Sequence, residues 1–284
     1  MVLESLINPK SHVKKSKAFF IGILFASISV LLSLWIFREF ASLSMVFLTV
    51  LAAFPFVYNT IKIQEEDDLT EKKESQILKD HSKALTTFIF LFFGFAVAFA
   101  IWYFILPTSL TSVLFKTQAD TILNINTRFA PNAVNSMRVF SVIFFNNLKV
   151  LVFCILFSFL YGAGALFILT WNASVIGTAM GNFIRSNFAS YAASTGFSKL
   201  GAYFHVFSLG LLRYSIHGIP EILSYFTAGL AGSIISVAVI NNSFHTNKFG
   251  KILIDVSDLI IIAVLLLVLS ALLEVYITPI FFGA

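Results

Sequence analysis

The feature that most constrains this sequence is a series of long apolar stretches without a single charged residue. Five of them are residues 18–37, 40–61, 84–115, 150–184 and 222–247, and a sixth follows Asp258 with one charge at Glu274. A helix needs about 20 apolar residues to cross the ~30 Å hydrocarbon core of a bilayer. The stretches are therefore long enough to be membrane-spanning helices.

The composition excludes several other classes of protein. The chain is 58% hydrophobic and 12% charged, whereas soluble domains carry about 25% charged residues. A soluble enzyme, a disordered chain and a disulfide scaffold are all excluded. Cys154, the one cysteine, lies in an apolar stretch, so we expect neither a disulfide nor a Cys/His metal site. We also expect no cofactor and no metal. The excess lysines flank the apolar stretches, so we expect no nucleic-acid partner either.

Backbone groups in lipid must be hydrogen-bonded within the protein, and uninterrupted apolar stretches favour helices over alternating barrel strands. The predicted fold class is an all-α, polytopic transmembrane helical bundle with six or seven spans and an interfacial helix.

Lysines predict the orientation. The N-terminus carries Lys10, Lys14, Lys15 and Lys17, and residues 62–83 carry five more lysines. Because loops rich in Lys and Arg stay in the cytoplasm, we place the N-terminus and residues 62–83 there, in a multi-pass protein of the cell membrane. Residues 62–83 also hold seven acidic residues. They fit a solvated, partly helical loop or, alternatively, a docking surface for a cytosolic partner.

Three regions follow from this pattern. Residues 1–106 form an N-terminal three-span region that includes the loop 62–83. Residues 107–145 form an external polar segment in which Pro131 begins a helix. Met137, Phe140 and Phe144 recur there at helical spacing, which fits either an amphipathic surface helix or an extension of the next span. Residues 146–284 form a C-terminal bundle.

The C-terminal bundle has an ambiguous middle. Residues 150–184 are too long for one upright helix, so we predict a turn at Asn172 and a fourth span over about 147–171. Residues 173–190 either cross as a fifth span or re-enter, and the lysine and arginine counts barely separate these topologies. We favour seven spans. Residues 199–213 look interfacial, and the last two spans are predicted over about 218–240 and 257–277.

Polar residues within or next to the spans are candidates for function, because charged groups in lipid are rare and costly. The predicted polar cluster comprises Asn146, Asn147, Lys149, His217, Glu221 and Glu274. Most of them have a structural alternative as well. Asn146 or Asn147 can cap a helix, and Pro220 with Glu221 suits a first helical turn. Glu274 near a helix C-terminus has no such explanation, because the helix dipole disfavours an anion there.

The last two spans are joined by the short loop 241–256 and should be antiparallel. The start of one then lies level with the end of the other, which brings His217, Glu221 and Glu274 to similar depth. The seven-span topology adds Asn146, Asn147 and Lys149. A charged Glu274 would need a partner such as His217 or Lys149.

Small residues let helices approach closely in lipid. The predicted packing positions are Gly162, Gly164, Gly177, Gly181, Gly229 and Gly232. Ordinary close packing explains them, and they argue that residues 147–240 form one bundle.

The order of these motifs resembles the stage II sporulation protein M family of integral membrane proteins. The motifs read FxNN at 144–147, HGxxE at 217–221, AGxxG at 228–232 and AxxExxxTP at 271–279. The front half, with Asn8-Pro9 and LFxGF at 91–95, is similar to the archaeal branch. The resemblance implies a multi-span protein that, in spore formers, anchors and helps assemble peptidoglycan-degrading partners.

Three functions follow as hypotheses. The first is a non-enzymatic scaffold that assembles membrane or cytosolic partner proteins, docking them on residues 62–83 or 107–138. The second is a transporter or channel that uses His217, Glu221 and Glu274. The third, an intramembrane hydrolase with Ser215 or Ser224 near His217, is weakly supported. The lipid bilayer is the expected environment, and a homo-oligomer is a further candidate assembly.

Overall fold

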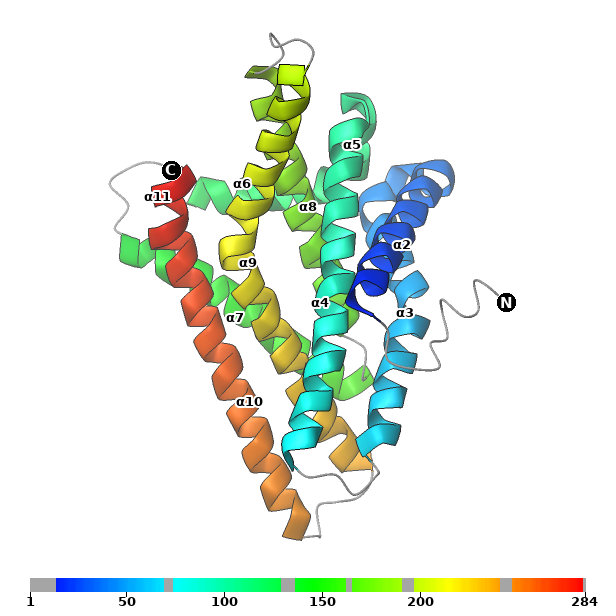
Figure 1. Ribbon diagram of the computed structural model, residues 1–284, viewed down its shortest axis with the longest axis vertical. Coiled ribbons are helices and arrows are strands. Elements are labelled where there is room, and N and C mark those ends of the chain that lie inside the picture. The colour runs from blue at the N-terminus through cyan, green and yellow to red at the C-terminus, as the bar shows by residue number, and fades with distance from the viewer. Residues whose placement is uncertain are drawn as a thin grey trace. The chain divides into compact units, whose positions relative to one another are not determined.

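Helices make up almost all of the chain that the computed structural model describes, namely residues 14–68, 74–128, 136–161, 165–190, 197–240 and 247–282 (Figure 1). The first half contains α2 (Lys15–Ile36), the 3-10 turn η1 (Arg38–Phe40), α3 (Ala41–Asp68), α4 (Glu74–Ile105), α5 (Thr108–Leu114) and α6 (Lys116–Arg128). The second half contains α7 (Ser136–Tyr161), α8 (Ala165–Ser190), α9 (Phe197–Ile240), α10 (Asn247–Leu272), the π-helical turn η3 (Leu273–Ile277) and α11 (Thr278–Phe282).

Within the described residues, seven helical segments are long and apolar enough to cross a membrane. They are Lys15–Ile36, Arg38–Thr60, Thr86–Ile105, Ser136–Phe159, Ala165–Asn187, Ser208–Ser236 and Ile252–Phe281. The predicted all-α polytopic fold is confirmed.

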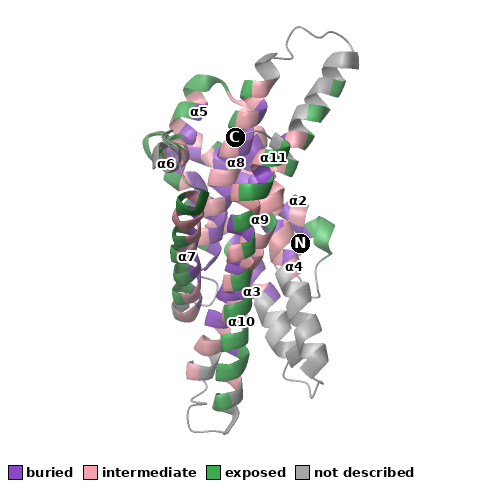
Figure 2. Ribbon diagram, turned by 90° about the vertical axis from the view of Figure 1, so that its left-hand side faces the viewer, coloured by how far each residue is buried: buried purple, intermediate pink, exposed green. Residues whose placement is uncertain are grey.

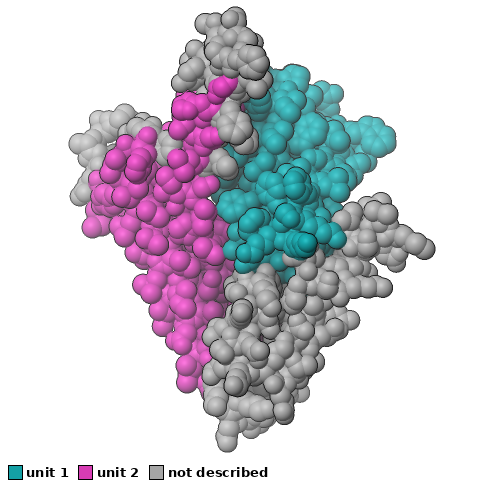
Figure 3. Space-filling model, in the orientation of Figure 1, with its two compact units in different colours: residues 1–122, 169–181 teal, residues 123–168, 182–284 magenta. Residues whose placement is uncertain are grey.

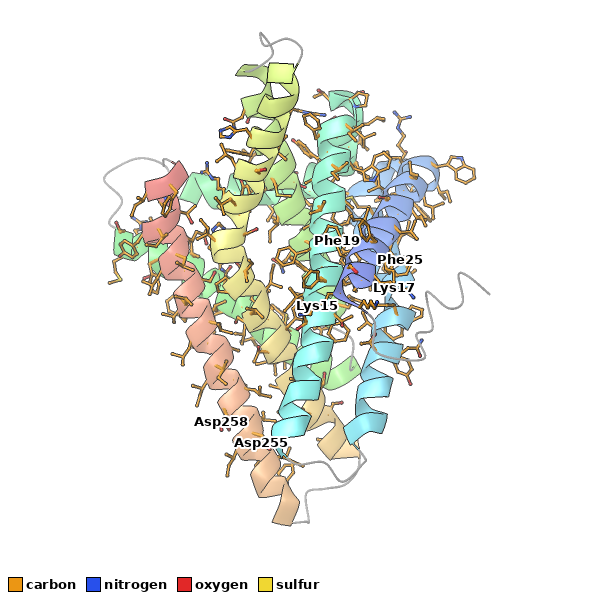
Figure 4. The ribbon with its side chains drawn as sticks, viewed as in Figure 1. Lys15, Lys17, Phe19, Phe25, Asp255 and Asp258 are labelled. Atoms are coloured by element: carbon orange, nitrogen blue, oxygen red, sulfur yellow. The ribbon has the colours of Figure 1, made fainter. Side chains whose placement is uncertain are left out.

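The ends of α2 carry the residues expected at the two surfaces of a bilayer. Lys14, Lys15 and Lys17 are exposed at its start, and Figure 4 labels two of them. Trp35, near its end, is 81% exposed. At 1.5 Å per residue, Lys15 and Trp35 are separated by about 30 Å, the thickness of the hydrocarbon core. Lysine ammonium groups and tryptophan rings both favour the membrane–water interface.

The predicted turn at Asn172 is wrong. Asn172 lies inside α8, a continuous helix from Ala165 to Ser190, and α7 ends at Tyr161. The spans predicted at 147–171 and 173–190 are therefore replaced by α7 and α8, and the re-entrant alternative does not describe α8. An asparagine is only a moderately poor helix former, and glycine is worse. The two glycines at 162 and 164 are thus a stronger signal for a boundary, although residues 162–164 lie outside the described chain.

The predicted boundary before Pro220 is also wrong. Pro220 lies inside α9, which runs from Phe197 to Ile240 and so includes the residues 199–213 that look interfacial. Proline is tolerated inside membrane helices when neighbouring groups satisfy the freed backbone. Residues 136–145 likewise form the first turns of α7, which is the second of the two alternatives given for them. Pro131 lies outside the described residues.

Helices α3 and α4 continue beyond their apolar parts. The apolar part of α3 ends at Thr60 but the helix ends at Asp68, and α4 begins at Glu74 although its apolar part begins at Thr86. These extensions add about 12 Å and 18 Å of helix, respectively. Much of the charged segment 62–83 is therefore helical.

Two compact units make up the chain (Figure 3). Unit 1 contains residues 1–122 and 169–181, and unit 2 contains residues 123–168 and 182–284. Helix α8 contributes residues to both. These units are defined by internal contacts, and the domain boundaries predicted from sequence at 106 and 145 stay a prediction.

Unit 1 is built on close helix contacts at glycines. A side chain at Gly22 of α2 would clash with the backbone of Leu91 and Gly94 on α4, and one at Gly94 would clash with the carbonyl of Phe19. Gly177 and Gly181 of α8 lie in the same way against the α4 backbone, at Ala96 and Ala100. The missing Cβ atoms let these backbones approach closely, which is how helices gain packing energy where lipid is as apolar as the side chains.

In unit 2, α9 packs against both α7 and α10. Gly232 of α9 lies against the carbonyl of Ile155 and the side chain of Ser158 on α7, and Gly229 lies against Ser158 and Ala165. Both α7 and α10 leave many apolar side chains exposed, as the green residues in Figure 2 show. The other two glycines predicted as packing positions, Gly162 and Gly164, lie outside the described residues.

Candidate functional site

Helices α9 and α10 run antiparallel, and two hydrogen bonds fix their register. Ser224 Oγ donates to the Ala263 carbonyl over 2.7 Å, and Ser270 Oγ donates to the His217 carbonyl over 2.8 Å. Seven residues separate the α9 members of these pairs and seven separate the α10 members, in opposite order. The part of α9 around His217 is therefore level with the end of α10.

The bond from Ser270 supports α9 next to Pro220. Proline has no N–H to bond the carbonyl four residues earlier, which is that of Ile216, and its ring pushes against the preceding turn. Ser270 is fully buried and donates from the neighbouring helix to the adjacent carbonyl, that of His217.

A π-helical turn follows at Leu273–Ile277, immediately before Thr278-Pro279. The Thr278 hydroxyl donates to the Leu273 carbonyl over 3.0 Å, and the same oxygen lies 3.3 Å from His217 Nδ1. A hydroxyl has one hydrogen to donate. Because that hydrogen goes to Leu273, the contact requires His217 Nδ1 to carry a hydrogen and to act as the donor. Wide turns of this kind are frequent at functional sites.

Glu221 and Glu274 lie on this same stretch of the two helices. Tyr225, fully buried one turn after Glu221, donates its hydroxyl to Glu221 Oε1 over 2.9 Å. Glu274 lies in the π-helical turn, between Ser270 and Thr278, which both contact His217. It is partly buried.

Hydrogen bonds join only some of the six residues of the predicted polar cluster to the site. His217 and Glu221 are one turn apart on α9, and Glu274 lies one turn beyond Ser270, which bonds the His217 carbonyl. Asn146 and Lys149 are exposed on α7, whereas Asn147 is buried and accepts from Asn146 over 3.4 Å. Within the described chain, no hydrogen bond or ion pair connects the three α7 residues to α9 or α10. Glu274 likewise has no ion pair with His217 or Lys149 among these residues.

Sequence reasoning missed several members of the site. Tyr225, Ser224, Ser270 and Thr278 make its hydrogen bonds, yet none was in the predicted polar cluster, and Ser224 was named only as a possible nucleophile. Helical spacing could have found three of them, because Tyr225 is four residues from Glu221, and Ser270 and Thr278 are each four from Glu274. Ser224 carries no such signal. Its hydroxyl donates to Ala263 rather than to His217, unlike a serine nucleophile with a histidine base.

Among the described residues, no group of three or more His, Cys, Asp or Glu side chains lies close enough together to hold a metal ion. Next to the site, Arg213 stacks on the Phe183 ring, with its guanidinium carbon 5.4 Å from the ring centre. Arg213 is thus positioned by an aromatic ring of α8 in unit 2.

These features define a polytopic helical membrane protein with a hydrogen-bonded polar seam between two antiparallel spans. A family model described as Stage II sporulation protein M matches residues 87–279. Because the match covers more than half of the sequence, the chain belongs to that family, and the resemblance seen in the motifs is confirmed. The match begins near the start of the third apolar helix, well before the first of the C-terminal motifs. No curated protein and no solved structure shows significant similarity to the chain.

We expect the Ser270 hydroxyl to stabilise the pairing of α9 with α10. Ser270→Ala should lower the free energy of unfolding in detergent by about 1–2 kcal/mol, since the His217 carbonyl loses a hydrogen bond inside the bundle. The matched control is Ser257→Ala, an exposed serine on α10 that bonds only its own helix.

An effect of Ser257→Ala as large as that of Ser270→Ala would contradict this account.

Proposed function

We propose that the chain is a non-enzymatic membrane protein that assembles partner proteins at the membrane. The observation that carries this proposal is the continuation of α3 and α4 beyond their apolar parts, to Asp68 and back to Glu74. A charged segment that continues as helix offers a pre-ordered surface. A partner binding such a surface loses less conformational entropy than one binding a flexible loop.

The charges on these extensions suit a protein partner. The end of α3 carries four consecutive acidic residues, 65–68, and lysines precede and follow them. Complementary charge on a partner would steer its encounter and set its orientation. Membership of the Stage II sporulation protein M family supports the same role, since the resemblance implies an anchor for other proteins. We place the extensions and the N-terminus in the cytoplasm, from the lysine pattern.

Charge reversal tests the docking surface. The variant Glu65→Lys, Glu66→Lys, Asp67→Lys, Asp68→Lys should reduce the recovery of wild-type partners at least tenfold, because like charges then face the partner's basic groups. Recovery is measured by quantitative mass spectrometry after in-cell cross-linking. Only proteins that are not captured in a parallel experiment with an unrelated polytopic membrane protein are counted as partners. The matched control reverses Asp255 and Asp258, exposed acids near the start of α10 on the same predicted side (Figure 4).

Two outcomes oppose this function. Partner recovery from the acidic-segment variant that equals wild type would remove the segment as a docking surface. Equal losses from both variants would point to net charge rather than to the α3 extension.

A second candidate function is ion or solute transport, and one specific observation favours it. Glu221 and Glu274 lie close together on spans, and the described residues give Glu274 no ion pair. Ionisable groups placed this way often mark ion pathways. In proteoliposomes, transport predicts a proton or monovalent-cation flux that falls at least tenfold in Glu274→Gln, because the amide cannot exchange a proton. Asp255→Asn, at an exposed site, is the control. Absence of wild-type flux across a broad ion panel would exclude this candidate.

A further inference from the structure

Gln118 in unit 1 has an unusual environment for a polar side chain. It lies on α6 and is fully buried, with 0% of its surface exposed. Its amide nitrogen, Nε2, donates to the Ser42 carbonyl on α3 over 3.1 Å and to Ser174 Oγ on α8 over 3.2 Å. One side chain thus joins three helices.

The orientation of this amide is fixed by its partners. The Ser42 carbonyl can only accept a hydrogen bond. Ser174 Oγ donates its one hydrogen to the Trp171 carbonyl over 2.7 Å, so it also accepts from Gln118. Rotating the amide by half a turn would set Oε1 against two acceptors. Nε2 must therefore face Ser42 and Ser174, and Oε1 must point the other way.

Oε1 of Gln118 is the one buried side-chain oxygen or nitrogen without a hydrogen-bond partner in the part of the chain that the structure describes. A buried acceptor without a donor costs the free energy of its lost hydration, because no protein hydrogen bond replaces the bonds to water. Native proteins therefore seldom contain such an acceptor. Buried water molecules commonly supply the missing bond and make two to four bonds themselves.

A second polar group lies where α3 meets α6. Ser42, whose carbonyl accepts from Gln118, also contacts Thr117 through its hydroxyl, with the two oxygens 2.6 Å apart. Thr117 precedes Gln118 on α6. The two hydroxyls need one hydrogen for the bond between them, so the other remains available to a further acceptor. The hydrogen-bond partners of Gln118 are all uncharged, which favours a neutral ligand over a cation.

We propose that one ordered water molecule is bound at this junction of α3, α6 and α8. It donates to Gln118 Oε1 and accepts from the Ser42–Thr117 hydroxyl pair. This water completes the hydrogen bonding of Gln118, the side chain that connects α6 to α3 and α8. This site is separate from the polar seam of unit 2.

The first test is a high-resolution structure of the full chain in lipid nanodiscs, in buffers with sodium and with potassium. We expect an isolated density about 2.6–3.0 Å from Oε1 in both buffers, the length of an O–H···O bond. No density at Oε1 would overturn the proposal. So would a density present only with one cation and surrounded by five or six oxygens, which would assign a cation instead.

The second test follows the water in lipid by water-edited solid-state NMR of glutamine-labelled protein. The chain has glutamines only at 64, 76 and 118, so the signal lost in Gln118→Met identifies Gln118. That signal should gain magnetisation from water in wild type and lose at least half of the transfer in Ser42→Ala, which keeps the carbonyl but removes the hydroxyl. Ser112→Ala, an exposed serine on α5, should leave the transfer unchanged. No transfer in wild type would contradict the proposal. If Gln118→Met fails to fold, the density test on wild type decides.

Discussion

The need of every backbone carbonyl for a donor inside a bilayer sets the arrangement of α9 and α10. Pro220 removes from α9 the N–H that would bond the Ile216 carbonyl. The Ser270 hydroxyl donates to the adjacent His217 carbonyl. Because Ser270 lies on α10, this bond also fixes the register of the pair. The register brings His217, Glu221 and Glu274 into the same stretch of the two helices.

Apolar stretches predict the fold class well, because the free energy of moving a charge into lipid exceeds most other local preferences. The seven membrane-length helices found in the described residues each overlap a span of the favoured seven-span prediction, whereas several of their boundaries differ from it. Asn172 and Pro220 look like helix ends when each is judged by its own propensity. In the folded chain, Asn172 continues α8, and a serine from α10 supports the helix around Pro220. For Pro220 that partner is distant in sequence.

The candidate site likewise has one part that the sequence predicts and one part that it does not. The antiparallel pairing that brings Glu274 level with His217 follows from chain connectivity, and sequence suffices to predict it. The identity of the bonded partners does not follow, because Ser270 and Thr278 are common residues whose roles depend on which face meets α9. Gln118 was missed for the same reason. Nothing in its sequence neighbourhood indicates that it is buried against Ser42 and Ser174, and only the packing of unit 1 places it there.

The polar seam and the charged helical extensions suggest different uses of the molecule. In the seam, each hydroxyl donates its hydrogen to a group on the same helix or on the facing one. These hydroxyls belong to Ser224, Tyr225, Ser270 and Thr278. Such bonds hold two spans together. The sequences of the α3 and α4 extensions instead carry charge beyond the apolar parts of these helices, and the proposal of partner assembly rests on them. Most of the seam has a structural role, and Glu274 is the residue of the seam for which no hydrogen bond is found within the described residues.

Disulfide cross-linking between α9 and α10 tests the central claim most directly, because the register of this pair determines which polar groups meet. In a Cys154→Ser background, the pair Ser224→Cys with Ala263→Cys and the pair His217→Cys with Ser270→Cys should each cross-link on mild oxidation in membranes. The mismatched pair His217→Cys with Ala263→Cys should not, since its members are about 10 Å apart along the helices. Efficient cross-linking of the mismatched pair, with none in the matched pairs, would contradict the antiparallel register.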